Sequence, residues 1–219
     1  MQEVRKLTKN PREAVSKAPI SVLLLACFFL VAPSYAANNA ASNANDALSD
    51  AMLSTFNHLI TIFEPEDATL DQQRTEVAQV VDFESITRGI LKDHLGQISD
   101  EQKQAFRNEF ERSITNLLGT ALKSAKEFDV AIERVQKSSK NPNRARVLGV
   151  LTSPKNERFE LLTTVAYKDE QWVVRNLVVN GINLGVTYRN QFNELVERNA
   201  GDIDATIAAW AAAVDQTAV

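Results

Sequence analysis

The spacing of apolar residues changes near Glu127, and this change limits the possible folds of the chain. In the preceding segment Phe106, Phe110 and Ile114 recur every four residues, which places them on one face of an α-helix. Between residues 128 and 132 apolar and polar residues alternate instead, which is the period of a β-strand. Helices followed by strands predict an α+β fold, with a helical block packed on a twisted, mainly antiparallel four-stranded sheet.

The same patterns divide the chain into elements. We expect helices over residues 46–63, 70–81, 83–96, 99–122, 183–199 and 203–210, and strands over residues 127–133, 147–151, 158–167 and 171–179. Ser99 and Gln102 form a capping box at the start of the fourth helix, and Asp82 is placed to cap the third. Short loops join most of the strands, so we expect them to be antiparallel neighbours.

The first 36 residues have the order of parts found in a secretory signal peptide. A segment with five Lys and Arg residues precedes an uncharged apolar run over residues 20–32, and Ser34 and Ala36 supply the small residues before a cleavage site. The apolar run is shorter than the roughly 20 residues that span a bilayer. We therefore expect a signal peptide over residues 1–36, a disordered polar leader over residues 37–45, and a single domain over residues 46–215.

Cys27 leaves an alternative to cleavage after Ala36. It follows Leu24-Leu25-Ala26, which resembles the lipobox at which bacterial lipoproteins are acylated. However, the apolar run continues directly beyond Cys27, whereas a lipoprotein usually turns polar after its cysteine. The pattern favours an ordinary cysteine within the signal peptide. The mature chain would then have no cysteine, and therefore no disulfide and no thiol nucleophile.

Removal of the signal peptide changes the charge of the protein. The full chain has 24 basic and 28 acidic residues, and residues 1–36 contain five of the former and two of the latter. The mature chain therefore has 19 basic and 26 acidic residues, a net charge of −7. Such a charge argues against nucleic acid as a partner and against lasting adhesion to an anionic bilayer.

The sequence contains no recognisable catalytic or metal-binding motif. His58 and His94 are each alone on a predicted helix, without a second ligand at metal-binding spacing. There is no G-x-S-x-G nucleophile motif, and the glycines at 181 and 185 do not match a phosphate-binding loop. We therefore expect no enzyme activity, no cofactor and no metal.

The segment from Trp172 to Phe192 resembles the MlaC family, also called the toluene-tolerance Ttg2 family. The matching residues are Trp172, Gly181, Leu184, Tyr188, Arg189, Gln191 and Phe192, and Ile182 stands where the family has valine. The resemblance extends over roughly residues 83–210. It implies an MlaC-like, NTF2-like fold in which the sheet and the helices enclose an apolar cavity for phospholipid tails.

The resemblance also implies a function and partners. It identifies a monomeric periplasmic carrier of glycerophospholipid in the system that maintains outer-membrane lipid asymmetry. Its partners would be an inner-membrane ABC transporter complex with an MCE-type subunit and an outer-membrane lipoprotein complex. The residues expected to line the cavity are Phe83, Ile90, Phe106, Phe110, Ile114, Leu118, Leu161, Val165, Tyr167, Trp172, Val174, Val179, Gly181, Ile182, Leu184, Tyr188 and Phe192.

Two residues near the expected cavity allow more than one interpretation. Arg189 is a possible ligand of the lipid phosphate, because a guanidinium group suits that anion. The alternative, which we favour, is that it caps its helix or pairs with Glu194 or Glu197. Gly119 interrupts a helix at a cost of about 1 kcal/mol relative to alanine. It marks either a close approach of another group or a tolerated glycine near the end of the helix.

Two other classes of protein fit the same order of elements. An NTF2-like enzyme would require a buried Asp, Tyr or His facing the cavity, for which Asp82 and Tyr167 are the only candidates. A non-carrier envelope protein would instead have a closed core and act through its partners alone. A cavity between sheet and helices distinguishes the carrier from this last class.

Overall fold

The α+β prediction is confirmed by the structure, a computed structural model that describes residues 43–65, 67–125 and 127–215. The sheet contains β1 (Asp129–Lys137), β2 (Arg144–Thr152), β3 (Arg158–Lys168), β4 (Gln171–Val179) and β5 (Ile182–Asn183). These strands lie in the order of the sequence, and each pairs antiparallel with the next. The predicted meander is therefore present, with five strands in place of four.

The additional strand depends on a tight turn directly before the expected helix over residues 183–199. Asn180 and Gly181 both have positive φ angles, 47° and 83°, and connect the paired residues Val179 and Ile182. Asn-Gly is the preferred sequence for this two-residue hairpin turn. The chain therefore forms a short strand before Asn183 caps the next helix by accepting the N–H of Val186.

The described helices are α3 (Asn43–Phe63), α4 (Leu70–Val80), α5 (Phe83–Ile90), the single 3₁₀ turn η1 (Leu91–Asp93), α6 (Asp100–Ala125), α7 (Leu184–Arg198) and α8 (Ile203–Asp215). Helix α3 begins at Asn43, so residues 43–45 of the expected disordered leader are helical. The expected signal peptide, with Cys27, and residues 37–42 of the leader lie outside the described residues.

Local capping signals explain where several helices begin. The predicted capping box at α6 is present: the backbone N–H of Gln102 donates to Ser99 Oγ at 3.2 Å, and the N–H of Ser99 donates to Gln102 Oε1 at 3.1 Å. An equivalent box, formed by Thr69 and Gln72, starts α4. Asp82 caps α5 as predicted, since its Oδ1 accepts the N–H of Ser85 at 3.1 Å.

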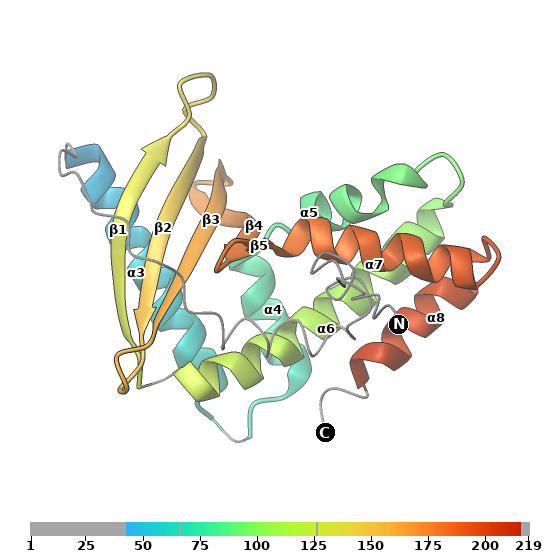
Figure 1. The fold of residues 1–219 in the computed structure, drawn as a ribbon, viewed down its shortest axis with the longest axis horizontal. Coiled ribbons are helices and arrows are strands. Elements are labelled where there is room, and N and C mark those ends of the chain that lie inside the picture. The colour runs from blue at the N-terminus through green and yellow to red at the C-terminus, as the bar shows by residue number, and fades with distance from the viewer. Residues whose placement is uncertain (1–42, 66, 126, 216–219) are drawn as a thin grey trace, which may run out of the picture.

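The sheet and the helices form two adjoining parts (Figure 1). Helix α3 lies along one face of the sheet, where Leu48 packs on Ala145, Val147 and Val165. The other part is the block formed by α5, α6, α7 and α8, which has its own apolar core. Phe56 of α3 packs against both this core and the cluster around Phe159 of the sheet, so α3 joins the two parts. Within the described ranges, no helix has the length and apolar content that a membrane-spanning helix requires.

Candidate functional site: an apolar cavity between sheet and helices

An apolar cavity of about 140 Å³ lies between β4 and the helices α5, α6 and α7. Its wall is apolar almost throughout, and α6 contributes the largest share of the side chains. The lining residues are Val81, Phe83, Ile86, Phe110, Ile114, Leu117, Leu118, Ala121, Val174, Arg175, Asn176, Leu177, Leu184, Gly185 and Tyr188.

The geometry of α6 and β4 explains which of their side chains reach the cavity. Residues 110, 114, 117, 118 and 121 of α6 follow the spacing of one helical face. On β4 the register against β3 shifts between Thr164 and Val165, and Arg175 is the extra residue of the bulge. Because of this bulge Val174 and Leu177, three residues apart, share the face that borders the cavity.

Seven of the residues expected to line the cavity do so: Phe83, Phe110, Ile114, Leu118, Val174, Leu184 and Tyr188. The structure brings them together from three helices and one strand. The other ten lie elsewhere, and they fall into three groups with different physical reasons.

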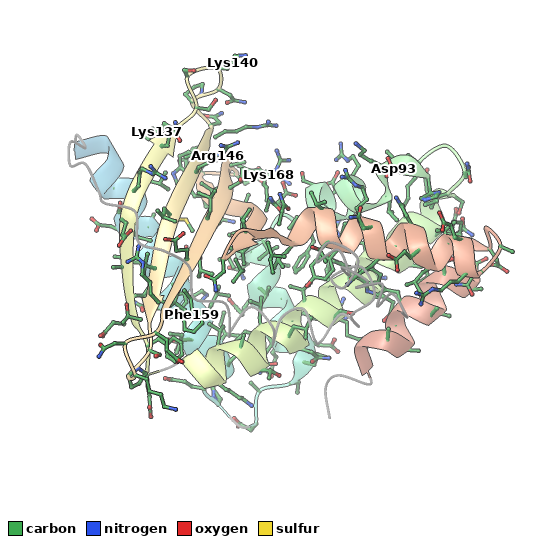
Figure 2. All side chains as sticks on the ribbon, viewed as in Figure 1. Asp93, Lys137, Lys140, Arg146, Phe159 and Lys168 are labelled. Atoms are coloured by element: carbon green, nitrogen blue, oxygen red, sulfur yellow. The ribbon has the colours of Figure 1, made fainter. Side chains whose placement is uncertain are left out.

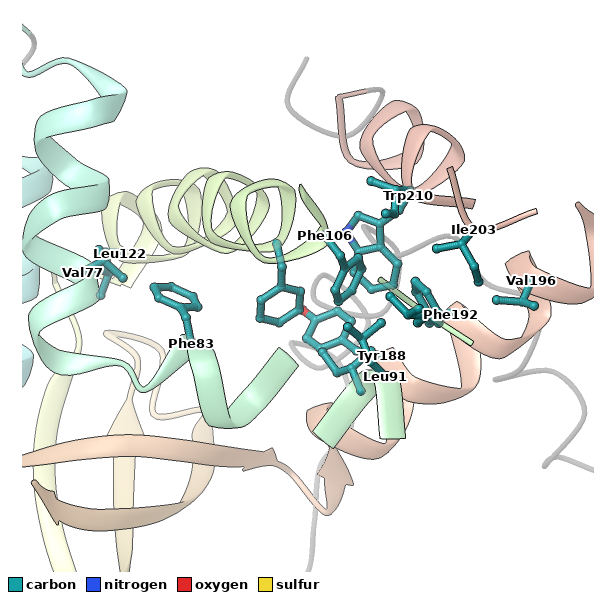
Figure 3. Close-up of a cluster of buried hydrophobic side chains, with 14 of the residues drawn as sticks. Val77, Phe83, Leu91, Phe106, Leu122, Tyr188, Phe192, Val196, Ile203 and Trp210 are labelled. Carbon is teal, nitrogen blue, oxygen red and sulfur yellow. The ribbon is translucent and has the colours of Figure 1, made fainter. Parts of the chain in front are cut away.

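The first group belongs to a filled core. Ile90, Phe106 and Phe192 are buried among the helices, where α8 contributes Trp210 (Figure 3). The ring centroid of Phe106 lies 4.8 Å from that of Phe192 and 5.2 Å from that of Trp210. These rings fill the space around Phe106, so Ile90, Phe106 and Phe192 do not line the cavity.

The second group lies on the strands away from the cavity. Val165 and Trp172 pack against the α3 side of the sheet, and Leu161 packs on the cluster around Phe159. Tyr167 is 44% exposed at the end of β3, and its ring lies 5.3 Å from that of Trp172. Alternation along β3 places Leu161, Val165 and Tyr167 on one face of the sheet. At Val165 this face is covered by α3 rather than by the cavity.

The third group surrounds the turn after β4. Val179 and Ile182 are half-buried partners in the hairpin, and Gly181 occupies the turn itself with no atom within 4 Å of an added Cβ. The positive φ angle of Gly181 explains why a glycine occupies this position, without any contact with a ligand.

One charged side chain, Arg175, borders the cavity. Its Nε lies 2.9 Å from Oδ2 of Asp82, whose side chain is only 3% exposed, and its Nη2 donates to Ser85 Oγ. The backbone N–H of Asp82 also donates to the carbonyl of Val174 at 2.9 Å, beside an isolated parallel bridge between Val81 and Val174. These contacts fasten the start of α5 to β4 at the edge of the cavity.

The ion pair determines the charge state of Asp82. Burial by itself raises the pKa of the Asp82 carboxyl, but hydrogen bonds from Ser85 and the charge and hydrogen bond of Arg175 outweigh it and lower the pKa below its ordinary value of 3.8. Asp82 is therefore an ionised structural carboxylate. Tyr167 is exposed at the end of β3, so the two candidates for an NTF2-like enzyme do not share a buried site.

Arg189 does not line the cavity. Its Nε lies 3.8 Å from Oδ2 of Asp93 in η1. The guanidinium group of Arg189 therefore forms an ion pair that joins α7 to η1. The expected structural role was a helix cap or an ion pair with Glu194 or Glu197 on the same helix, whereas the partner is Asp93. Asp93 is distant in sequence, and only the packing of η1 against α7 brings it close.

The two histidines also make structural contacts. His94 Nε2 lies 2.9 Å from Oδ1 of Asn193, and its ring packs 5.9 Å from that of Phe192. His58 Nε2 lies 3.4 Å from Oε2 of Glu76. The described part of the chain holds no group of three or more His, Cys, Asp or Glu side chains able to bind a metal ion.

Several cavity residues were not predicted. Ile86, Leu117 and Ala121 lie on helical faces that the sequence pattern already marks as apolar, so their burial was detectable but their contact with a cavity was not. Val81 borders the cavity because it forms a bridge with Val174, and Arg175 borders it because it is the extra residue of the bulge in β4. Gly185 lies against the side chain of Asn176, whose Oδ1 accepts the Gly185 N–H at 3.2 Å; an added Cβ would lie 2.7 Å from that oxygen.

Comparison with known proteins agrees with this architecture. Residues 46–212 match the family model of the MlaC protein. The toluene tolerance protein ttg2D of Pseudomonas putida is 30% identical over 149 residues, which cover 68% of this chain and 68% of that protein. A solved structure of the phospholipid-binding protein of Ralstonia solanacearum, in complex with a phospholipid, superposes with a TM-score of 0.66 at 18% identity. That comparison covers 81% of this chain and 100% of the other.

Proposed function

This chain belongs to the MlaC family, and from that membership and the cavity we propose that it is a phospholipid carrier rather than an enzyme. The observation that carries the proposal is the apolar wall between β4, α5, α6 and α7. A wall of this kind suits acyl chains, which form no hydrogen bonds. The similar solved structure, that of a phospholipid-binding protein in complex with a phospholipid, supports the same ligand class.

The energetics of acyl chains explain the need for such a protein. Two chains with about 30 methylenes in all would cost roughly 24 kcal/mol if exposed to water, at about 0.8 kcal/mol for each methylene. Transfer from a bilayer into an apolar cavity exchanges one hydrocarbon environment for another. Loading and unloading therefore have a small net free energy, and partner proteins set the direction.

The size of the cavity implies that loading widens it. Its volume of about 140 Å³ is similar to the roughly 150 Å³ of an engineered cavity that binds benzene. Acyl chains require far more space, so we propose that α5 separates from β4 as the lipid enters. The links across this boundary include the Val81–Val174 bridge and the Asp82–Arg175 ion pair.

The proposed route follows from the family and from the N-terminal sequence. We propose export through the signal peptide of residues 1–36 and action in the periplasm as a monomer. The carrier would relay glycerophospholipid between an inner-membrane ABC transporter complex with an MCE-type subunit and an outer-membrane lipoprotein complex. The acidic net charge of the mature chain suits a soluble carrier that crosses an aqueous compartment.

Native mass spectrometry tests the ligand directly. We would express the full chain with its own signal in a Gram-negative periplasm, purify it without detergent, and extract and identify the bound lipid. We expect an adduct with the mass of one phospholipid. The same spectrum reports the mass of the processed chain, which distinguishes cleavage after Ala36 from acylation at Cys27.

A matched pair of variants localises the ligand. Ala121 lines the cavity, whereas Ala212 is exposed on α8 and does not line it. Ala121→Trp fills the cavity with an indole ring, so we expect the lipid adduct to disappear. Ala212→Trp introduces the same side chain outside the cavity and should retain the adduct. A wild-type protein without extractable lipid, or an A121W variant with unchanged lipid content, would refute the proposed site.

A further inference from the structure

Five basic residues gather at one end of the sheet. Lys137 ends β1, Arg144 and Arg146 begin β2, Lys168 ends β3, and Lys140 lies in the loop between the first two strands. Because β1, β2 and β3 are antiparallel neighbours, these positions are brought to the same end, as Figure 2 shows for the four that it labels. All five are exposed. We refer to them as the basic end of the sheet.

None of these five cations forms an ion pair with any other residue of the described chain. Arg158, near the opposite end of the sheet, behaves differently: it makes two bonds of 2.7 Å to the carboxylate of Glu133. The basic end therefore has charge that the fold itself does not neutralise. Unsatisfied positive charge on a surface attracts an anionic partner.

Hydrogen bonds hold the loop between β1 and β2, which contains Lys140, in a defined conformation. Ser138 Oγ accepts the backbone N–H groups of Lys140 and Asn141, and Asn141 Oδ1 accepts the N–H of Asn143 at 2.9 Å. The N–H of Tyr167 donates to the carbonyl of Asn143 at 2.8 Å and so ties the loop to β3. A groove of about 450 Å³ lies between the loop and the strands. Its lining includes Lys137, Lys140, Arg144, Arg146 and the hydroxyl residues Ser138, Ser139 and Thr164.

An exposed aromatic residue lies at the same end of the sheet. Tyr167 is 44% exposed and immediately precedes Lys168, so the two side chains leave β3 on opposite faces of the sheet. Tyrosine has an apolar ring and a polar tip, and it is enriched where proteins meet the boundary between bilayer and water. Basic residues and an exposed aromatic ring at the same end of a sheet suit an anionic lipid surface that meets this end, because the head groups attract the cations while the ring enters the interface.

The acidic net charge does not prevent this contact. At physiological ionic strength charges separated by more than about 8 Å are largely screened, so the charge nearest the bilayer dominates. Asp169 and Glu170 occupy the neighbouring turn between β3 and β4, but five cations exceed these two carboxylates at this end. The acidic remainder of the protein would orient the basic end toward an anionic surface.

We propose that the basic end of the sheet is a docking surface for bilayers that contain anionic phospholipid. The groove and the flanking cations bind phosphate-bearing head groups, and Tyr167 adds an interfacial contact. This surface is separate from the apolar cavity, since the two share no lining residue. The inference therefore does not depend on the proposed function.

Vesicle sedimentation tests the proposal with the full mature chain. Vesicles of phosphatidylcholine alone would be compared with vesicles of phosphatidylcholine and phosphatidylglycerol, at low and at physiological salt. We expect binding to the anionic vesicles that weakens as salt increases. The double substitution Lys140→Glu and Arg146→Glu should reduce this binding at least about 25-fold, because each basic residue near an anionic surface contributes about fivefold.

The control carries the same change of net charge at other places. Lys123 on α6 and Lys155 in the turn after β2 are exposed and lie away from the basic end. The double substitution Lys123→Glu and Lys155→Glu should reduce binding less than about threefold, because screening limits the effect of distant charges. The cavity variant Ala121→Trp should bind vesicles like the wild type, which separates docking from lipid carriage.

Three results would overturn the proposal. In the first, the wild type does not bind anionic vesicles, and an acidic surface of a partner protein would then be the ligand that suits these cations. Another is equal loss of binding in both double variants, which would indicate an effect of net charge alone. The third is equal binding to vesicles with and without phosphatidylglycerol.

Discussion

The carboxylate of Asp82 has two structural roles. Oδ1 caps α5, and Oδ2 pairs with Arg175 of β4. We expect Asp82→Asn to retain the cap, since asparagine is also a strong cap residue, but to lose the charge pair. The variant should lower the free energy of unfolding by about 2 kcal/mol at neutral pH. Urea denaturation of the two proteins measures this difference.

The dependence on pH identifies the charge of Asp82 as the cause. The folded state lowers the pKa of Asp82, so its contribution to stability is present above the unfolded value of about 3.8 and is lost as the pH falls through the folded pKa. The difference between wild type and Asp82→Asn should therefore shrink below about pH 3.8. Asp67→Asn, at an exposed carboxylate, should change stability little at any pH. A difference that stays constant down to acid pH would contradict the role of the ion pair.

At the scale of elements, Gly119 sets the distance between α6 and α3. A Cβ at this position would lie 2.9 Å from Cδ1 of Phe63, whose ring is buried and has little room to move. The glycine therefore marks the close approach of a side chain from another helix. Gly119→Ala gains about 1 kcal/mol of helix propensity but incurs about 2 kcal/mol of overpacking. We expect a net loss of about 1 kcal/mol in thermal or urea unfolding.

In a protein that also carries Phe63→Val, we expect the effect of Gly119→Ala on stability to change sign. Phe63→Val removes the δ carbons that Gly119 accommodates, so in this background Gly119→Ala should stabilise the protein by about 1 kcal/mol. Gly89 of α5 serves as the control, because it is exposed and no atom lies within 4 Å of an added Cβ. Gly89→Ala should stabilise both backgrounds. If Gly119→Ala has the same effect in both, the two residues are not coupled.

Elements whose signals lie within a few neighbouring residues were predictable. The capping box at Ser99 and the cap at Asp82 are local hydrogen bonds, so the sequence alone predicts where α6 and α5 begin. The strand β5 and the bulge at Arg175 depend on pairing with another strand. The Asn180-Gly181 turn was a detectable signal for β5, whereas no single-sequence pattern predicts the bulge.

At the scale of the whole molecule, the sequence predicts which helical faces are buried but not which of them border a cavity. Phe106 and Phe110 lie one turn apart on the same face of α6. The rings of both residues lie near that of Trp210, but Phe106 also packs against Phe192 and is fully enclosed, whereas Phe110 borders the cavity. The difference arises because α8 fills only one end of the space between the helices, and the relative positions of helices are a tertiary property.

Lipid in the cavity should also raise the stability of the whole fold. A ligand that binds only the folded state adds about 4 kcal/mol when its concentration is a thousand times its Kd, and for a domain of this size that corresponds to a rise in Tm of about 10 °C. We expect protein purified from the periplasm to unfold at a correspondingly higher temperature than the same protein after lipid extraction and refolding. In Ala121→Trp the indole ring occupies the cavity, so both preparations should unfold at the same temperature, while Ala212→Trp should keep the difference. An equal Tm for the two wild-type preparations would mean that the cavity gains no stability from lipid.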